Sequence, residues 1–309
     1  MAQSRAPAFA LPGSGSTWDR FEAFAEWAAD DLSLARLAEG HFDALAILNE
    51  AGVPAPGVGT TYGVWAARSG GLGVTARLES DGWHLSGMRQ FCSGSGMIDR
   101  ALVTAEAPDG YRLFDLDVAM NVVRVLPDSW VAVGMADSRS ETVEFGGPPL
   151  PESGAIGPPG FYLDRPGFWF GAAGVAACWY GGAVGLLLNV VESQGAASSE
   201  VVMVSIGRAV AAVAAMRHVL RGVAREIDDD PTDASGEAQR RSMSARQAIH
   251  AGATEVLGLV ATAGGARPLC HDRLQAQRAA DLYVYLAQHH GAQDAAALGA
   301  LALKEQGWS

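Results

Sequence analysis

The sequence predicts an α+β protein with a short helical N-terminal segment, a central antiparallel β-barrel and a C-terminal antiparallel four-helix bundle. Two changes in the spacing of apolar residues support this fold class. The spacing changes from a helical period to alternation near Thr60, and it returns to a helical period beyond about residue 165. Hydrophobic residues make up 49% of the 309 residues, so the chain has enough apolar surface to fold into packed domains.

The first predicted domain, residues 1–59, is a truncated helical domain behind a loose arm. Residues 1–16 are rich in Ala, Pro, Gly and Ser, which is typical of such an arm. Thr17 is a candidate cap for a first helix, and a second helical pattern with an apolar face covers residues 32–48. Gly52 is expected to stop that helix.

The second predicted domain, residues 60–150, is the β-barrel. Its short segments are rich in β-branched and aromatic residues, and turn residues separate them. Residues 80–82 and 108–110 have the composition of hairpin turns. The Gly- and Pro-rich stretch at 146–160 marks the boundary with the third domain.

The third predicted domain, residues 151–309, contains four long helices joined by short connections, which is typical of an antiparallel bundle. The expected helices cover residues 167–194, 199–227, 238–263 and about 273–303. The first has no charged residue between 167 and 191 and is long enough to span a membrane. Because no cluster of Lys and Arg flanks it, we expect the most deeply buried helix of the bundle instead.

Composition excludes several classes of function. The formal net charge of −12 argues against nucleic acid as a partner, since such a surface repels phosphates. The 3 cysteines lack metal-ligand spacing, so we expect no metal site, and no phosphate-binding loop or nucleophile elbow occurs. No basic segment followed by an apolar one opens the sequence, so we expect a cytoplasmic protein without a membrane span.

The strand region around residues 81–107 carries the most specific pattern in the sequence. Its residues resemble the middle-domain pattern of the acyl-CoA dehydrogenase superfamily, and the predicted order of helices, barrel and bundle resembles that family as well. The matching residues are Gly87, Arg89, Phe91, Cys92, Ser93, Gly94 and Ser95. Taken singly, each also suits an ordinary barrel strand.

The resemblance implies an FAD site. Phe91 would pack on the isoalloxazine ring, the Ser93 hydroxyl would point toward flavin N5, and Gly94 would follow them in the flavin site at the end of the same predicted strand. The backbone of Val64 and Trp65 would face the pyrimidine side of the ring. A flavin needs such a flat apolar wall with a few polar groups at its redox-active edge.

The resemblance also assigns a role to Gly264 and Gly265 at the end of the third bundle helix, whose backbone would approach the FAD of a partner subunit. From the residues alone, this pair is also compatible with a simple helix C-cap.

The sequence departs from the family at the positions that matter for dehydrogenation. Abstraction of an α-proton from an acyl thioester requires a positioned base. Neither of the family's two positions for the catalytic Glu carries a carboxylate here. The first falls near Val175 in the uncharged run, and the C-terminal motif that holds the second is missing. The pattern that grips the FAD pyrophosphate is also missing after that helix, so the catalytic residues stay unknown.

The last predicted helix resembles the flavin monooxygenase branch of the superfamily. It carries Arg278 and Asp281, followed by His289 and His290. A helical spacing of four residues places Asp294 beside His290, where a carboxylate could orient the imidazole. The alternative interpretation is an ordinary solvated polar pair.

Other polar residues of the helical half are weaker candidates, with capping or surface roles as the first expectation. These are His250, Glu255, His271, Asp272 and the Arg residues of the helix at 199–227.

Three hypotheses follow for the function. The first is an FAD-dependent oxidoreductase resembling acyl-CoA dehydrogenases, with hydride transfer from an acyl thioester-like substrate to flavin N5. The second is a flavin-dependent monooxygenase of the same superfamily, and the third is a catalytically degenerate binding or assembly subunit. The expected partners are a small-molecule substrate such as an acyl-CoA, an electron-transfer protein, and further copies of the chain in a homodimer or homotetramer.

Overall fold

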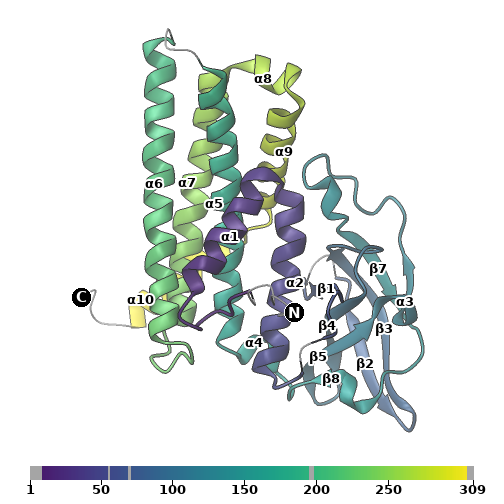
Figure 1. The fold of residues 1–309 in the computed structure, drawn as a ribbon. Coiled ribbons are helices and arrows are strands. Elements are labelled where there is room, and N and C mark those ends of the chain that lie inside the picture. Colours follow the sequence, from purple (N-terminus) through teal and green to yellow (C-terminus); the bar gives the residue numbers. More distant parts are fainter. Residues whose placement is uncertain (1–8, 55, 69–70, 195–197, 305–309) are drawn as a thin grey trace, which may run out of the picture. The chain divides into compact units, whose positions relative to one another are not determined.

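The computed structural model describes residues 9–54, 56–68, 71–194 and 198–304 (Figure 1). The chain forms two compact units. The sheet unit covers Arg36–Phe168, and the helical unit combines Met1–Ala35 with Trp169–Ser309. The mixed α+β class is confirmed, whereas the division into three domains stays a prediction.

The sheet unit contains one mostly antiparallel sheet. Its path of hydrogen-bonded neighbours is β6-β7-β3-β2-β4-β5-β8, and β1 lies off this path beside β4. Both β1 and β2 pair with β4 in parallel orientation, and the other pairs are antiparallel. The strands described are β1 (Tyr62–Trp65), β2 (Val74–Glu79), β3 (Gly82–Cys92), β4 (Arg100–Ala107), β5 (Gly110–Asp117), β6 (Val122–Val125), β7 (Glu141–Phe145) and β8 (Ala155–Ile156).

The prediction of a closed barrel is wrong. Within the described residues, β6 pairs only with β7 and β8 pairs only with β5, so the two ends of the sheet do not meet. Closure requires hydrogen bonds between the first and last strands of the path, and β8 is only two residues long. The sheet therefore curves but stays open.

The core of the sheet unit lies on both faces of β4. Trp65, Trp83 and Phe114 belong to one buried cluster, and Leu102 and Leu113 belong to a second cluster together with residues of α2 (Leu32–Glu50). Alternate residues of a strand point to opposite faces, so the unbroken run of buried residues in β4 indicates a strand that is covered on both sides. Short helices α3 (Val118–Asn121) and α4 (Phe161–Asp164) complete the unit.

The helical unit is built from long helices that lie alongside one another (Figure 1). The predicted bounds of two helices agree with the structure to within about two residues. Ser199 caps α6 through its hydroxyl, and α7 ends at Gly264. The helices are α1 (Thr17–Asp30), α5 (Gly167–Ser193), α6 (Glu200–Asp229), α7 (Ala238–Gly264), α8 (Ala266–His271), α9 (Arg273–Ala287) and α10 (Gly291–Lys304).

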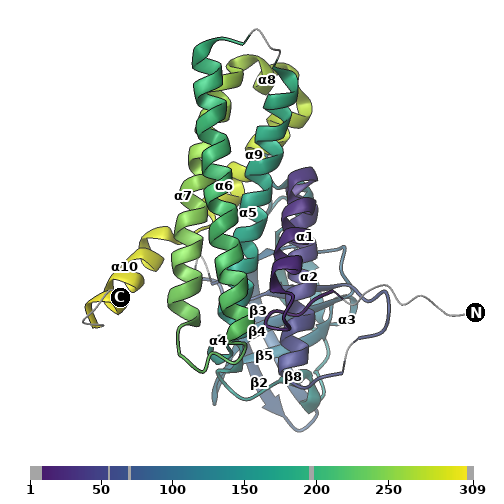
Figure 2. The ribbon, with the colours of Figure 1, turned by 60° about the vertical axis from the view of Figure 1, so that its left-hand side comes forward.

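The expected fourth helix is divided in two. The helix ends at Ala287, and α10 begins at Gly291, so the predicted continuous helix from 273 to 303 is wrong. Helix α10 starts against α7, where Gln247 Nε2 donates a hydrogen bond to the Gly291 carbonyl, and then projects away from the other helices (Figure 2). Because α1 also packs against α6, the unit is more than the simple four-helix bundle that we expected.

Close approach of α1 explains the uncharged helix α5. A Cβ atom on Gly181 would lie 2.2 Å from the Ala25 carbonyl oxygen, and one on Gly185 would lie 2.2 Å from that of Ala29. Only glycine allows two helices to come this near along their backbones. The prediction that α5 is a buried helix is confirmed, since 72% of its most apolar window is buried.

Length and composition alone would allow both α5 and α6 to cross a membrane, which is by itself a weak indication. Only 17% of the most apolar window of α6 is buried. Its exposed apolar side chains include Val201, Met203, Val204 and Val210.

Thr17 has a different role from the predicted cap. It is the first residue of α1 rather than its N-cap, and its hydroxyl donates to Asp228 Oδ1 at 2.6 Å. Asp228 also accepts hydrogen bonds from the backbone N–H groups of Gly15 and Thr17. The N-terminus of α1 is therefore capped by a carboxylate from the end of α6.

Thiol chemistry should follow the burial of the three cysteines. Cys92 and Cys178 are buried and Cys270 is exposed, and burial raises the pKa of the Cys92 thiol. Thiolates rather than thiols react, so we expect one equivalent of a colorimetric disulfide reagent to react rapidly with the native protein, and three after denaturation. Cys270→Ser should abolish the rapid phase; rapid reaction of a second thiol would contradict this.

Candidate functional site

The end of β3 presents Phe91 in an unusual backbone conformation. Phe91 has φ +60°, a left-handed value that is uncommon for an aromatic residue. The register between β3 and β7 shifts between Arg89 and Cys92 at the same point. This bulge turns the Phe91 ring outward, so the residue is 40% exposed and packs edge-on against Trp130.

Phe91 belongs to an exposed apolar surface on the sheet unit. Val131 and Val133 follow Trp130 and are 82% and 79% exposed, and Met97 is 51% exposed. These exposed apolar residues flank Phe91 and its partner Trp130 in the chain, and exposed apolar groups of this size are candidates for a ligand-binding or interaction surface. We refer to Phe91, Met97, Trp130, Val131 and Val133 as the apolar patch.

Two predicted residues, Trp65 and Ser93, are brought together. The buried Trp65 donates a hydrogen bond from Nε1 to the Ser93 carbonyl at 2.9 Å. The side chain of Val64 lies in the other core cluster with α2, so only its backbone is available to a ligand. Strand β1 pairs with β4 alone among the described strands, which leaves the other backbone edge of β1 without a strand partner.

Three serine hydroxyls form a chain from the turn after β3 into the interior. Ser93 Oγ lies 2.8 Å from Ser140 Oγ, and Ser140 Oγ lies 2.9 Å from Ser138 Oγ. Ser138 Oγ in turn donates to the Met135 carbonyl at 2.7 Å. Ser138 and Ser140 are buried and Ser93 is half-buried, so Ser93 is the outer end of this hydroxyl chain.

Gly94 holds the same turn against the segment before β7. Its N–H donates to the Ser138 carbonyl at 2.8 Å. Its φ of +76° favours glycine, and a Cβ there would meet Ile98 and Leu37 within 3.2 Å. Contrary to the sequence prediction, Ser93 and Gly94 lie beyond the strand, which ends at Cys92.

Gly264 and Gly265 lie at the end of α7 in the helical unit. Gly264 is the last helical residue, and Gly265 has φ +64° and open space around the position of a Cβ. This geometry is that of a helix C-terminus with an accessible backbone.

The histidine prediction needs a correction, because His289 rather than His290 lies beside Asp294. His289 Nδ1 is 3.6 Å from Asp294 Oδ2, whereas His290 is exposed. His290 precedes the first residue of α10, so its side chain does not project from a helical position, although the Asp294 N–H still donates to the His290 carbonyl. The His289 side chain itself is fully buried.

His289 is the centre of a cluster drawn from α5, α7, the α9–α10 connection and α10. Its ring centroid lies 4.8 Å from that of His250 and 5.2 Å from that of Trp179. The Arg246 guanidinium lies over the Trp179 ring at 4.7 Å, and its Nη2 is 3.3 Å from His289 Nδ1. We call His250, His289, Arg246, Asp294 and Trp179 the histidine cluster.

The surroundings of His289 hold it neutral. Burial lowers its pKa to about 4, and the positive charge of Arg246 acts in the same direction. Because a guanidinium can only donate, Nδ1 accepts and the neutral ring carries its proton on Nε2. Neither His289 Nε2 nor Trp179 Nε1 has a hydrogen-bond partner among the described residues. Two buried N–H donors in one cluster suit an acceptor atom of a ligand.

The lowered pKa of His289 predicts a pH dependence of stability. The unfolded chain binds a proton near pH 6.5 and the folded protein only near pH 4, so acidification through this window favours unfolding. We expect a loss of about 1–2 kcal/mol, which is less than the full shift because nearby polar groups screen the charge. Urea unfolding at pH 7.0 and 4.5 measures it. His289→Gln should lose less stability than wild type over this window, and an equal loss would contradict the assignment.

Other predicted residues do not join the histidine cluster. Arg278 donates to the Gly185 carbonyl, and Asp281 accepts a hydrogen bond from Gln277. Glu255 pairs with Arg208 on the surface. The predicted capping role near His271 is confirmed for Asp272, whose carboxylate accepts from two N–H groups at the start of α9.

The remaining Arg residues of α6 lie at its surface. Arg217 and Arg221 stack on Trp18, and Arg225 pairs with Asp229. The segment where the family grips the FAD pyrophosphate includes residues 195–197, which lie outside the described residues.

Sequence reasoning missed Arg246, Trp179 and the central place of His250. In the sequence, His250 is one of several polar residues on a predicted helix. This pattern does not distinguish a buried histidine from one at the surface.

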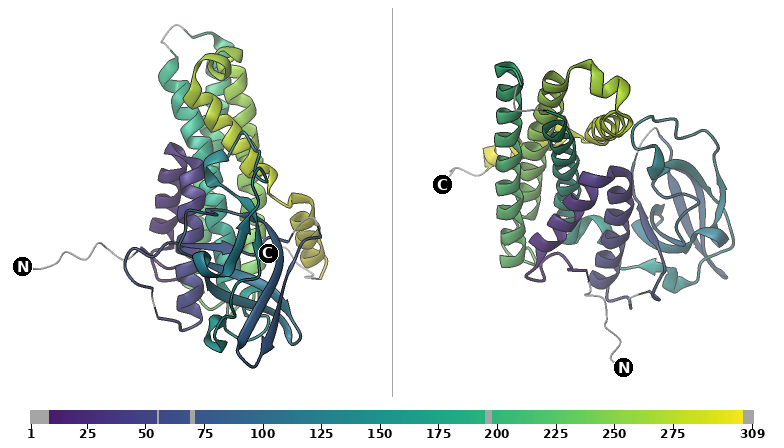
Figure 3. Two further views of the ribbon diagram at one scale, coloured as in Figure 1. Left: turned by 90° about the vertical axis from the view of Figure 1, so that its right-hand side faces the viewer. Right: turned by 45° about the horizontal axis from the view of Figure 1, so that its top comes forward.

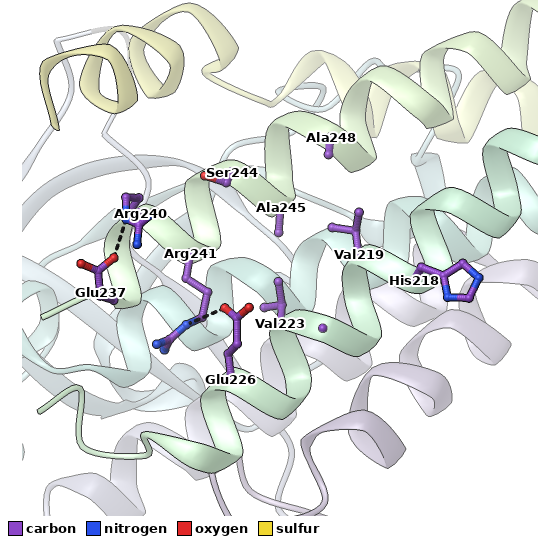
Figure 4. Close-up of a pocket in the computed structure, with 11 residues that line it drawn as sticks. His218, Val219, Val223, Glu226, Glu237, Arg240, Arg241, Ser244, Ala245 and Ala248 are labelled. Atoms are coloured by element: carbon purple, nitrogen blue, oxygen red, sulfur yellow. Dashed lines mark hydrogen bonds and ion pairs between the residues drawn. The ribbon is translucent and has the colours of Figure 1, made fainter. Parts of the chain in front are cut away.

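A groove of about 660 Å³ lies between α6 and α7 (Figure 4). Ion pairs Glu226–Arg241 and Glu237–Arg240 border it, and Val219, Val223 and Ala245 form its apolar part. None of the predicted site residues lines this groove.

The fold is similar to that of several solved monooxygenases. The dibenzothiophene monooxygenase TdsC from Paenibacillus sp. A11-2 is 22% identical over 94% of this chain and 84% of its own, with a TM-score of 0.80. The 3-HSA hydroxylase from Rhodococcus sp. RHA1 is 14% identical over 97% and 87%, with a TM-score of 0.79. Methanesulfinate monooxygenase MsuC from Pseudomonas fluorescens is 17% identical over 93% and 83%, with a TM-score of 0.79.

The chain has the acyl-CoA dehydrogenase-like fold. The structural likeness confirms the fold that the strand pattern and the order of elements suggested. No family model and no curated protein matches the sequence.

Proposed function

We propose that the protein is a flavin-dependent monooxygenase that inserts one oxygen atom into a small organic substrate. The observation that carries the proposal is the histidine cluster, in which a buried, neutral His289 presents an unpartnered Nε2–H. Structural neighbours support it, since TdsC was solved with FMN and indole and XiaF from Streptomyces sp. with FADH2.

The residues of the sheet unit fit a flavin. Phe91 and the other residues of the apolar patch offer exposed apolar side chains, and Ser93 offers a hydroxyl two residues after Phe91. Among the described strands β1 pairs only with β4, so the backbone N–H and C=O groups on its other edge at Val64 and Trp65 would complement the C=O and N–H groups of a flavin pyrimidine ring. We propose that these residues and Gly94 hold the flavin, as FAD or FMN, and that the backbone at Gly264 and Gly265 approaches a partner's flavin.

When bound, a reduced flavin supplies two electrons to dioxygen, so that one oxygen atom enters the substrate and the other leaves as water with two protons. The protein's own contribution is to hold and move a proton. His289 keeps its proton at Nε2 across neutral pH, because Arg246 donates to Nδ1 and disfavours a second proton. Asp294 balances the charge of Arg246, whose Nε lies 3.6 Å from it.

Acyl-thioester dehydrogenation has less support, because it requires a free carboxylate base. Within the described part of α5 the first charged residue is Glu192, at the far end of the helix. Asp281 and Asp294 both have hydrogen-bonding or charged partners.

Two experiments separate the hypotheses. Purified protein is mixed with FAD or FMN, oxidised or reduced by dithionite, and binding is followed by absorption and fluorescence. Protein loaded with reduced flavin then receives indole with air, and protein loaded with oxidised flavin receives an acyl-CoA without air. Oxygen-dependent formation of a hydroxylated product supports the proposal. Bleaching of oxidised flavin by the acyl-CoA would overturn it in favour of the dehydrogenase, and failure to bind flavin in either state would favour the degenerate subunit.

The expected partners and location are part of the same proposal. A soluble cytoplasmic protein of this kind needs an electron-transfer partner, namely a reductase that supplies reduced flavin. We also propose a homodimer or homotetramer, because Val201, Met203, Val204 and Val210 leave an apolar face of α6 exposed. Light scattering at micromolar concentration tests the assembly, and a monomer would contradict it.

A further inference from the structure

We infer that the hydroxyl chain makes Ser93 a hydrogen-bond acceptor toward its ligand, so that the protein selects reduced flavin over oxidised flavin. This inference rests on the proposed function, and it takes the contact of Ser93 with flavin N5 from the family resemblance. It goes further because it attributes a preference for one redox state of the flavin to Ser93, Ser138 and Ser140. Neither Ser138 nor Ser140 contacts the flavin in the proposed function.

The direction of the hydroxyl chain follows from its inner end. Ser138 Oγ lies 2.7 Å from the Met135 carbonyl oxygen. A carbonyl oxygen can only accept, so the single hydroxyl proton of Ser138 points at Met135. Two oxygen atoms at this distance without a proton between them would repel each other.

The next two links are then determined. Ser138 has no second proton, so the 2.9 Å contact with Ser140 must use the proton of Ser140. Ser140 in turn has none left, so the 2.8 Å contact with Ser93 must use the proton of Ser93. Ser93 therefore donates inward, and only the lone pairs of its Oγ remain for a ligand.

The backbone around the chain keeps this arrangement rigid. The Ser93 carbonyl accepts from Trp65 Nε1, and Gly94 N–H donates to the Ser138 carbonyl. Ser138 and Ser140 are 1% and 6% exposed, so water does not compete for their hydroxyls. Reversal of the chain would leave the Ser138 oxygen against the Met135 carbonyl without a proton, which is unfavourable in a buried place.

The two redox states of a flavin differ at N5. Oxidised flavin has a bare nitrogen there, which accepts a hydrogen bond, whereas reduced flavin has an N–H group, which donates one. If Ser93 can only accept, it forms a hydrogen bond with the N5–H group of reduced flavin. With oxidised flavin no hydrogen bond forms, because neither Ser93 nor N5 offers a proton. A neutral hydrogen bond contributes about 0.5–1.5 kcal/mol, and an unmade one costs a similar amount. We therefore expect reduced flavin to bind roughly tenfold tighter through this contact.

The test compares dissociation constants for oxidised and dithionite-reduced FMN and FAD in four proteins under nitrogen. These are wild type, Ser140→Ala, Ser138→Ala and Ser86→Ala. Ser140→Ala removes the group that accepts the Ser93 proton, so the Ser93 hydroxyl can donate to the ligand instead. Ser138→Ala removes the group that accepts the Ser140 proton, so Ser140 can donate to Ser93 and leave the Ser93 proton for the ligand. Ser86, an exposed serine on the same strand β3, is the matched control.

We expect the ratio of oxidised to reduced dissociation constants to fall about five- to tenfold in Ser140→Ala, to fall less in Ser138→Ala, and to stay unchanged in Ser86→Ala. The midpoint potential of the bound flavin should fall in parallel, by about 30 mV for a tenfold change in the ratio of a two-electron couple. A structural role alone would weaken both redox states equally.

The outcomes separate this inference from the proposed function. Wild-type protein that binds neither redox state would overturn both. Tight flavin binding with a ratio that stays within twofold in both Ser140→Ala and Ser138→Ala would overturn the hydroxyl-chain inference and leave the monooxygenase proposal standing.

Discussion

Replacement of His289 by glutamine is expected to slow oxygen-dependent product formation about 100-fold or more, which is the usual contribution of a positioned proton donor or acceptor. Glutamine keeps a neutral, hydrogen-bonding side chain of similar length, but it cannot release and regain a proton near neutral pH. The dissociation constant for reduced flavin should change less than about twofold, because no proposed flavin contact is removed. Stopped-flow mixing of the reduced, loaded protein with oxygenated substrate measures the rate.

The adjacent histidine is the matched control for this experiment. His290 is exposed and lies outside the histidine cluster, so His290→Gln should keep the wild-type rate. A loss in His290→Gln with full activity in His289→Gln would restore the prediction made from sequence and refute the cluster as the reactive centre.

Arg246 is expected to act on His289 as a positioning residue. Its charge is the second cause of the lowered pKa of His289, after burial. In Arg246→Gln that pKa should rise, so the acidic limb of the rate profile should move to higher pH while His289 is retained. A purely structural role would lower the rate without moving the profile.

Alanine at Gly181 or Gly185 is expected to destabilise the protein more than any surface change. Each new Cβ would lie 2.2 Å from a backbone carbonyl oxygen of α1, and a backbone atom cannot rotate away as a side chain can. Helices α1 and α5 would have to separate, which costs about 2–3 kcal/mol for overpacking and loses buried contacts of Phe21 and Phe24. Chemical denaturation followed by circular dichroism measures the loss.

A glycine elsewhere in the helical unit supplies the control. Gly258 lies on the exposed side of α7, and a Cβ there would meet nothing within 4 Å. Gly258→Ala should therefore stabilise the protein by about 0.5–1 kcal/mol through helix propensity. If Gly181→Ala proves as stable as Gly258→Ala, α1 does not pack on α5 in the way described.

The element order was predictable because it depends on local patterns. The helical and alternating periods, the turn residues and the caps such as Ser199 and Asp272 act within a few residues of each other. Figure 3 shows the resulting helices and strands, each within its own unit. The strand pattern at Phe91 and Ser93 was also visible, since it lies within one short segment.

Features that depend on contacts between distant segments could not be predicted in the same way. Whether the sheet closes depends on β6 and β8 meeting, and the capping of α1 depends on Asp228, more than 200 residues away. The helix break after Ala287 leaves His290 just before α10, and His289 lies beside Asp294 instead, which the assumption of one continuous helix could not reveal.

The sequence by itself therefore determined which segments are helices and strands, that α5 is buried, and where an aromatic and hydroxyl-bearing segment occurs. Only the tertiary structure decided which side chains act together. The histidine cluster joins residues from α5, α7, the α9–α10 connection and α10, and the hydroxyl chain joins Ser93 with Ser138 and Ser140. Protonation states and hydrogen-bond directions are properties of such assemblies, because burial and the fixed geometry of donors and acceptors exist only once the chain has folded.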